Sequence, residues 1–400
     1  MVPLCLERAG AAPLIAGISV SSIQEDKGFI QALLPHVSRI SHLSLVGYPL
    51  IKDVTDILPG FFASPMLNLT SLELEQDREP THLFPSSQVH PPPLLQSVSK
   101  LKSLHFTRVP LYPVLFGIES LVDLKLVDYK FPFQKFIGFL ESNLNLEAVE
   151  LRIEFSKSSL PTTPERVVSL PRLRRLALIC NNSIDARALL SSLYLPHGIN
   201  IGVQGSRENS CGDMLSFLPC PSTHIQDLFA PITTIKYLPS PERLHLYGNN
   251  GSLSFHSNGA PQNFYEELDL FDTSAVREFH LPNRHRDRLY WVLERLPALE
   301  ALIISQGNPG QTVLSVLAKE PLLCPSLKII AFLDCGMNHE LVNELEMVLT
   351  KREHSTAARL HQVVIVNRTY DLPGHFLISR IRRIVPRVDV MASDELPDFL

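Results

Sequence analysis

The chain of 400 residues is 45% hydrophobic and 19% charged, and its formal net charge is −5. This composition excludes a disordered chain, which needs low hydrophobicity and a high net charge. The chain also lacks the strong basic excess of proteins that neutralise many phosphates, so we expect no nucleic-acid partner. No apolar run reaches the ~18 residues of a membrane span, and we expect no membrane partner.

The amino terminus and the cysteines indicate an intracellular protein. Glu7 and Arg8 stand where a signal peptide would have its apolar centre, and no basic segment precedes them. The six cysteines are sparse and unclustered, which is typical of reduced thiols and not of a disulfide framework. The expected location is therefore cytoplasmic or nuclear.

A short pattern recurs along the chain: a leucine, two residues, an apolar residue, one residue, and a second apolar residue. The last two apolar residues alternate as they do in a strand with one buried face. Clear copies begin at Leu69, Leu101, Leu121, Leu146, Leu173, Leu299, Leu327 and Leu360. Weaker copies lie at 40–45, 241–246, 267–270 and 276–281.

Segments with helical periodicity lie between these strands, at residues 29–37, 133–140, 186–193, 288–296, 313–317, 341–349 and 376–384. Each strand–helix unit is too small to bury its own apolar face, so neighbouring units must stack. The order predicts an α/β fold, a leucine-rich-repeat solenoid in which helices back a curved parallel sheet of irregular repeats. We expect one array over residues 1–400, with a Pro-rich insertion at 76–96 and an irregular insertion or hinge at 202–241. Residues 199–203 are a candidate degenerate strand.

Three copies of the pattern carry a further mark. Asn181, Asn249 and Cys335 each stand three residues after the last apolar residue of their strand. The leucine-rich-repeat signature has Asn or Cys there. An inward-turned side chain at this place bonds backbone groups that leave the strand and would otherwise be unpaired. We therefore expect these three side chains to face inward.

The amino-terminal stretch carries two further motifs. One is the segment from Leu6 to Leu14, with Glu7, Arg8, small residues and Pro13; the other is the Leu-Leu-Pro-His helix that begins at Leu33 and leads into the first repeat strand. Together with the degenerate repeats that follow, they make nearly the whole chain resemble F-box proteins of mushroom-forming fungi, the basidiomycetes.

This resemblance implies a substrate receptor of a cullin-RING ubiquitin ligase, in which the F-box docks the Skp adaptor and the repeats hold the protein to be ubiquitinated. In the family the F-box lies before the segment that begins here at Leu6, and five residues precede it in this sequence. We therefore expect the Skp adaptor as a partner only if an F-box exists upstream. The alternative is a stand-alone repeat scaffold, or an F-box-less relic without a ubiquitin-ligase role.

No catalytic constellation, cofactor fingerprint or metal motif stands out, and we expect a chain that is not an enzyme and holds no cofactor. Cys211, Cys220 and His224 are close in sequence, but zinc ligands usually pair at shorter spacing, which favours a loop that contains thiols. Basic residues gather at 284–288 and 380–387. Acidic residues follow the second group and aromatic interleaving is missing, which favours solvated helix faces over nucleic-acid binding.

Partner binding is expected on the concave sheet face, where the residue between the two last apolar positions of each strand projects. These residues are Ser44, Glu73, His105, Lys125, Glu150, Ala177, His245, Asp269, His280, Ile303, Ala331 and Val364. We interpret the scattered histidines as solvated polar residues between the leucines, and not as a pH switch or as ligands. The last three residues are apolar. Either they form an exposed protein-binding patch, or the carboxy-terminal tail, 388–400, folds back and covers them.

Overall fold

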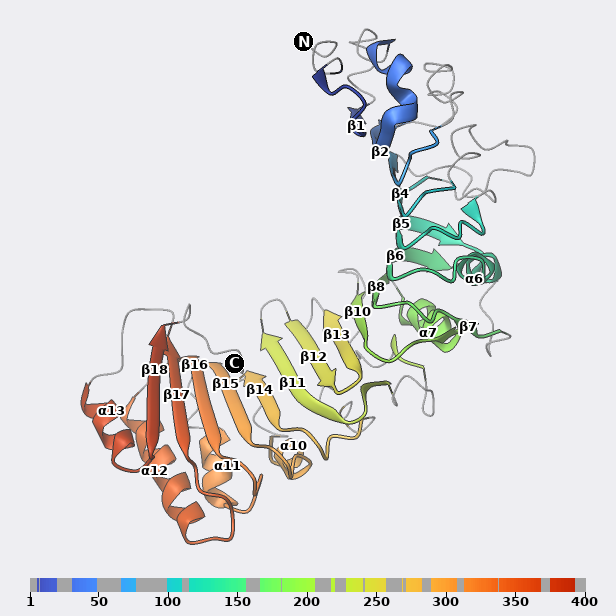
Figure 1. Ribbon diagram of the computed structural model, residues 1–400. Coiled ribbons are helices and arrows are strands. Elements are labelled where there is room, and N and C mark those ends of the chain that lie inside the picture. Colours follow the sequence, from blue (N-terminus) through green and yellow to red (C-terminus); the bar gives the residue numbers. More distant parts are fainter. Residues whose placement is uncertain are drawn as a thin grey trace. The chain divides into compact units, whose positions relative to one another are not determined.

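The computed structural model describes residues 6, 8–19, 31–48, 66–76, 99–109, 115–155, 166–180, 182–205, 217–219, 228–239, 242–256, 268, 271–282, 289–307, 313–336, 338–367 and 375–392. The chain divides into two compact units, which we call unit 1 (1–209 with 216–219) and unit 2 (210–215 with 220–400). Among the described residues, the main sheet has sixteen strands, eight in each unit. The fold is an α/β leucine-rich-repeat solenoid, as predicted (Figure 1).

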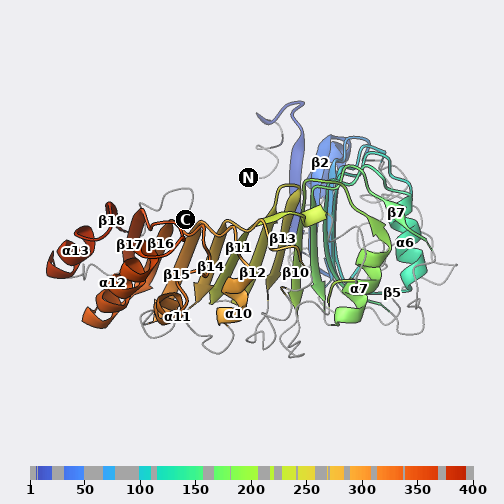
Figure 2. The ribbon, with the colours of Figure 1, turned by 90° about the horizontal axis from the view of Figure 1, so that it is seen from below.

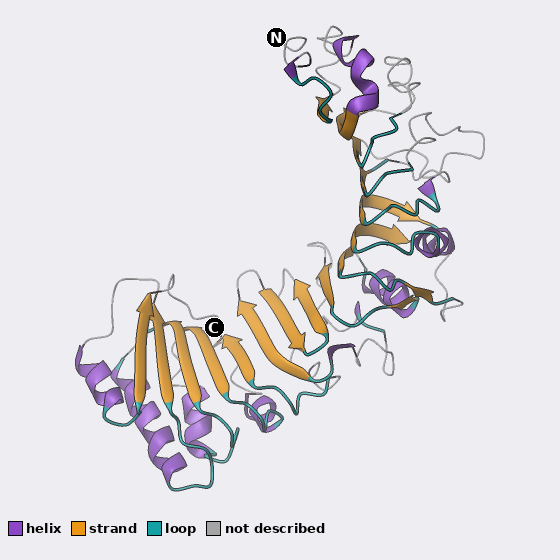
Figure 3. Ribbon diagram, in the orientation of Figure 1, coloured by secondary structure: helices purple, strands orange, loops and turns teal. Residues whose placement is uncertain are grey.

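Unit 1 is a parallel sheet whose helices lie on one of its sides (Figure 3). Its strands, in spatial and chain order, are β1 (Leu14–Ser19), β2 (Ile40–Tyr48), β3 (Ser71–Gln76), β4 (Ser103–Thr107), β5 (Asp123–Phe131), β6 (Ala148–Phe155), β8 (Arg175–Cys180) and β10 (Ile199–Gly205). The strands β7 (Val168–Ser169) and β9 (Leu193–Tyr194) pair separately. The described helices are the 3-10 helix η1 (Leu34–Arg39), α6 (Phe133–Glu141) and α7 (Ser183–Ser191).

The recurring apolar residues stack into a ladder that forms the core of unit 1. The first strand leucine of each repeat is buried and lies opposite its equivalent in the next strand, as Leu72 does with Leu104 and Leu104 with Leu124. The ladder continues through Val149 and Leu176. Each strand contributes only one row of these apolar side chains, so they are buried only when neighbouring repeats stack. The pattern therefore predicts a solenoid only where it recurs along the chain.

The helices of unit 1 have identifiable local causes. The Phe133, Phe136 and Phe139 side chains of α6 are buried, and the Phe133 ring packs edge-on against Phe155 of β6. In α7 the side chain of Asn182 accepts a hydrogen bond from the Ile184 N–H at 2.9 Å, which caps the helix. These helices cover the sheet face to which the leucines point.

Unit 2 is a mixed sheet. Its strands, in spatial order, are β13 (Gly251–His256), β12 (Glu242–Gly248), β11 (Ile232–Pro239), β14 (Glu278–Pro282), β15 (Ala301–Gly307), β16 (Ile329–Cys335), β17 (Gln362–Asn367) and β18 (Arg387–Ala392). Its described helices are α10 (Leu289–Glu294), α11 (Val313–Lys319), α12 (His339–Glu353) and α13 (His375–Arg382), which lie along one side of the strands (Figure 2).

A β-hairpin interrupts the parallel order, because β11, β12 and β13 pair antiparallel in sequence. The prediction that Asn249 faces inward is wrong: it is exposed in the hairpin turn between β12 and β13. The Asn-Asn-Gly stretch that ends at Gly251, with its φ of 151°, is typical of such turns. A Cβ added to Gly248 would lie 2.0 Å from the Phe229 carbonyl oxygen, so the chain needs a glycine there.

Cys335 confirms the inward prediction. Its side chain is buried, and its thiol donates to the Ile304 carbonyl oxygen of the neighbouring strand at 3.4 Å. Asn181 and the Pro-rich insertion, apart from Gln76 at the end of β3, lie outside the described residues. The candidate strand at 199–203 is confirmed as part of β10, whereas β1, β11, β13, β18 and the short strands β7 and β9 were not predicted.

One arginine holds the turn structure around α12 together. The Arg352 side chain is 1% exposed, and its guanidinium makes five hydrogen bonds to backbone carbonyls. The acceptors are Pro321, Leu323, Cys324 and Ala358. Such a planar donor set satisfies carbonyls that the loops leave unpaired.

Candidate functional site

The face of the sheet that no described helix covers, which we call the helix-free face, corresponds to the predicted concave face. In unit 1 the predicted residues form one row across it, because each lies opposite the next in the strand register. We call this the middle row; its unit 1 members are Gly17, Ser44, Glu73, His105, Lys125, Glu150, Ala177 and Gly202.

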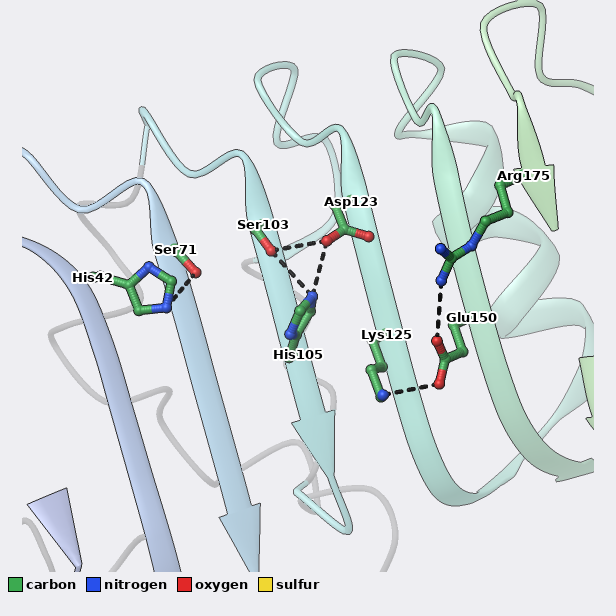
Figure 4. A network of polar contacts seen from close by, with 8 residues as sticks. All are labelled: His42, Ser71, Ser103, His105, Asp123, Lys125, Glu150 and Arg175. Atoms are coloured by element: carbon green, nitrogen blue, oxygen red, sulfur yellow. Dashed lines mark hydrogen bonds and ion pairs between the residues drawn. The ribbon is translucent and has the colours of Figure 1, made fainter. Parts of the chain in front are cut away.

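Ion pairs link the middle row of unit 1 to a second row two residues earlier in each strand (Figure 4). The Lys125 ammonium lies 2.9 Å from one Glu150 carboxylate oxygen, and the Arg175 guanidinium lies 3.3 Å from the other. The Glu150 side chain is 24% exposed, whereas that of Arg175 is 64% exposed. The positive groups therefore remain reachable while Glu150 fixes their positions.

A second polar group joins β4 to β5. The His105 Nε2 lies 2.9 Å from the Asp123 carboxylate, and the Ser103 hydroxyl donates to the same carboxylate at 3.2 Å (Figure 4). The hydrogen bond with His105 is the main cause that lowers the pKa of Asp123, against the opposing effect of burial. Further along, the Ser71 hydroxyl and His42 Nε2 are 3.3 Å apart.

Ser103, His105 and Asp123 contain the side chains of a hydrolase triad but not its geometry. A relay requires the serine and the aspartate on opposite ring nitrogens of the histidine. Here both contact Nε2 of His105, at 3.1 Å and 2.9 Å, and Ser103 also bonds Asp123 directly. The group is therefore arranged to fix side chains on a surface, with the histidine as a bridge.

Unit 2 has an equivalent middle row, and the strand register places five predicted residues on it: His245, His280, Ile303, Ala331 and Val364. Three members were not predicted, namely Ser254, Lys236 and Asp389. The hairpin explains the first two, because the sequence pattern of a repeat strand does not mark β11 or β13. Asp269 lies outside the described residues.

Basic and imidazole side chains gather on the helix-free face of β11, β12 and β13. The His245 and His256 ring centroids are 5.8 Å apart, and Arg243 lies opposite His256 in the register. Burial, followed by the nearby His256, Arg243 and Lys236, lowers the pKa of His245 to about 4. The pKa of His256 is also lowered, by burial and by Arg243.

One carboxylate, that of Glu278 on β14, lies beside this region and contacts Lys236 and His280. Glu278 accepts from His280 and lies 3.3 Å from the Lys236 ammonium. Burial opposes ionisation of Glu278, but the His280 hydrogen bond and Lys236 outweigh it, so its pKa is lowered. His280 is 5% exposed in its side chain, and burial lowers its pKa despite Glu278. This pair is thus a satisfied, buried element of the sheet.

The apolar part of the row is covered. Ile303, Ala331 and Val364 are fully buried, in one cluster with Val366, and Met391 of β18 packs against it. The exposed-patch interpretation therefore does not fit the structure. The tail prediction is wrong for 388–392, which form β18 at the sheet edge, while 393–400 lie outside the described residues.

The remaining candidates have structural partners or lie outside the description. In α13, Arg380 pairs with Glu346 of α12 at 2.7 Å, and Arg387 pairs with Asp389 at 2.8 Å. Residues 284–288 and the Cys211, Cys220 and His224 segment lie outside the described residues. Among the residues described, no group of His, Cys, Asp and Glu is arranged to hold a metal.

The described cysteines, 180, 324 and 335, are buried and form no disulfide with one another. Burial raises the pKa of the Cys180 thiol to about 12, and likewise that of Cys324. Such thiols are inert packing groups, because the thiolate is the reactive form. In the described part of the chain, no helix has the length and apolar character needed to cross a membrane.

Comparisons with known proteins identify no family for this chain. No family model matches the chain, and no curated protein matches it. A crystal structure of a Bacteroides fragilis protein is similar at 10% identity and a TM-score of 0.24, over 96% of this chain and 74% of that one.

Proposed function

We propose that this chain is a protein-binding leucine-rich-repeat module that holds its partner on the helix-free face of unit 1. The observation that carries the proposal is the middle row of polar side chains, in register over consecutive strands from Ser44 to Glu150. A rigid parallel sheet presents these groups at fixed spacing, which suits recognition of another protein's surface.

Charge is positioned on this face but not cancelled. Arg175 and Lys125 are tethered by Glu150 and are 64% and 40% exposed in their side chains. Exposed ion pairs add little to stability, so their arrangement is more informative about a partner than about folding. Complementary charge at an interface sets partner choice and association rate.

The cellular role that we propose is a substrate receptor, or the receptor-like part of one, in a cullin-RING ubiquitin ligase. The support for this role is the amino-terminal resemblance to fungal F-box proteins, with the Leu33–His36 motif leading through η1 into β2. In that role the middle row meets the protein to be ubiquitinated.

Affinity capture of the chain from a native lysate, followed by mass spectrometry, tests the role. The proposal predicts recovery of a Skp-type adaptor and a cullin together with further proteins as substrate candidates. Recovery of other proteins without this pair would remove the ligase role and leave an interaction scaffold. Recovery of no protein above the level of an unrelated control would contradict both.

A further inference from the structure

The two units differ in the charge that their helix-free faces present. In unit 1 the cations alternate with carboxylates: Lys125 and Arg175 share Glu150, and His105 faces Asp123. On β11, β12, β13 and β14 the described side chains of this face include five basic or imidazole groups and one carboxylate. They are Lys236, Arg243, His245, His256, His280 and Glu278.

Glu278 does not neutralise this group. It is engaged by His280 and Lys236, and it is 19% exposed. The other three basic side chains of this face lie on β12 and β13. No described carboxylate forms an ion pair with Arg243, His245 or His256. The Arg243 Nε is buried and makes no hydrogen bond to the described residues. We call Lys236, Arg243, His245 and His256 the basic cluster.

The basic cluster lies on a surface that a chain segment can reach. All four side chains are partly exposed, and Tyr247, 39% exposed, stacks beside His245 with ring centroids 6.1 Å apart. The four strands from β13 to β14 span about 14 Å at the usual strand spacing. An extended peptide of about five residues covers that distance.

We infer that the basic cluster of unit 2 binds an acidic peptide segment, rich in Asp and Glu, of the partner protein. The inference rests on the proposed protein-binding function and adds the chemistry of the segment that is bound. Carboxylates would accept hydrogen bonds from Arg243 and from the two imidazoles, which become donors at both nitrogens when protonated. The tyrosine supplies an apolar contact beside them.

The proton balance of the site agrees with an anionic ligand. Burial is the main cause of the low pKa of His245, and His256 on β13, Arg243 on its own strand and Lys236 on β11 lower it further. A bound carboxylate has the opposite effect and favours the charged imidazole. Binding therefore takes up protons, and affinity increases as the pH falls from about 6.5, the ordinary pKa of an imidazole, to about 5, where glutamate side chains are still mostly ionised.

The full chain can be tested by fluorescence anisotropy with a labelled peptide of about ten glutamates, compared with a matched lysine peptide. The chain's net charge of −5 disfavours unspecific attraction of the glutamate peptide. We expect saturable binding of the glutamate peptide and none of the lysine peptide. Arg243→Gln and His256→Gln should each weaken binding about tenfold, the size of one lost charge-assisted contact.

Lys351→Gln is the matched control, because it removes an exposed cation of α12 in the same unit, on the helix side of the sheet. It should change the affinity about twofold or less. His256→Gln should also reduce the pH dependence, and Trp291 fluorescence in α10 reports whether each variant keeps unit 2 folded.

Absence of binding, equal binding of the lysine peptide, or equal weakening by Lys351→Gln would overturn the inference. Those results would leave the proposed function standing if a captured partner still depends on Lys125 and Glu150. Conversely, specific peptide binding without any captured partner would uphold the site and contradict the function.

Discussion

Replacing Val364 by aspartate tests whether the apolar part of the middle row is covered. Val364 is 0% exposed and packs with Ile303, Ala331 and Val366. Loss of the buried valine costs about 2 kcal/mol. A carboxyl without partners in an apolar cluster costs about 3 kcal/mol more. The expected loss of about 5 kcal/mol reaches the lower end of the free energies of unfolding of native domains, which are about 5–15 kcal/mol.

Ala177→Asp is the matched control, because Ala177 occupies the same row in unit 1 and is partly exposed. It should cost less than about 1 kcal/mol. Urea denaturation, followed by circular dichroism and by the fluorescence of the single tryptophan, Trp291, gives both values. If Val364→Asp shifts the midpoint no more than Ala177→Asp does, the face is open to solvent and our account of it is wrong.

Three further predictions concern other parts of the fold. Arg352→Met should destabilise unit 2 by about 3–5 kcal/mol, since four carbonyls lose their donor, and exposed Lys351→Met should be near neutral in the same urea titration. Gly248→Ala should lower the stability by about 2–3 kcal/mol, because the added Cβ would lie 2.0 Å from the Phe229 carbonyl oxygen. The control Gly138→Ala, which has nothing within 4 Å of its Cβ, should be neutral or stabilising. Equal melting temperatures of the two variants in thermal denaturation would refute this prediction. The pKa of His245 is about 4 in the folded state, below the ordinary 6.5, so its contribution to stability is complete above pH 6.5 and declines as the pH falls towards 4. His245→Gln should therefore flatten the curve of unfolding free energy against pH between pH 6.5 and 4. An unchanged slope would count against the lowered pKa.

The repeat pattern predicted most of the fold because its physical cause is local. Each repeat strand carries an apolar residue that stacks on its equivalent in the next strand, as Leu72 does on Leu104. This residue recurs in the sequence and can be recognised there. The hairpin is different, because its strands β12 and β13 pair with each other and need no repeat register. Its signal was the turn at residues 249–251, and the repeat reading assigned Asn249 to the inward position instead.

The sequence predicted which residues of the candidate site lie on the same face of the sheet, but not which side chains contact one another. The middle position of each strand identified Lys125 and Glu150, and a period of two residues would also have placed Asp123 and Arg175 on the same face. Which carboxylate meets which cation depends on the register between strands. The burial of Val364 depends on what lies over the sheet, which a strand's own sequence does not state.

The central claim, that a partner binds the helix-free face of unit 1, is tested most directly by exchanging two charges. The double variant Lys125→Glu with Glu150→Lys keeps an ion pair between β5 and β6 but reverses the pattern that a partner meets. Lys135→Glu, on the exposed side of α6, is the control. The account predicts that quantitative capture of the partner falls about tenfold or more with the exchange and is unchanged with the control. Equal recovery of the same partner by wild type and exchange variant would contradict it.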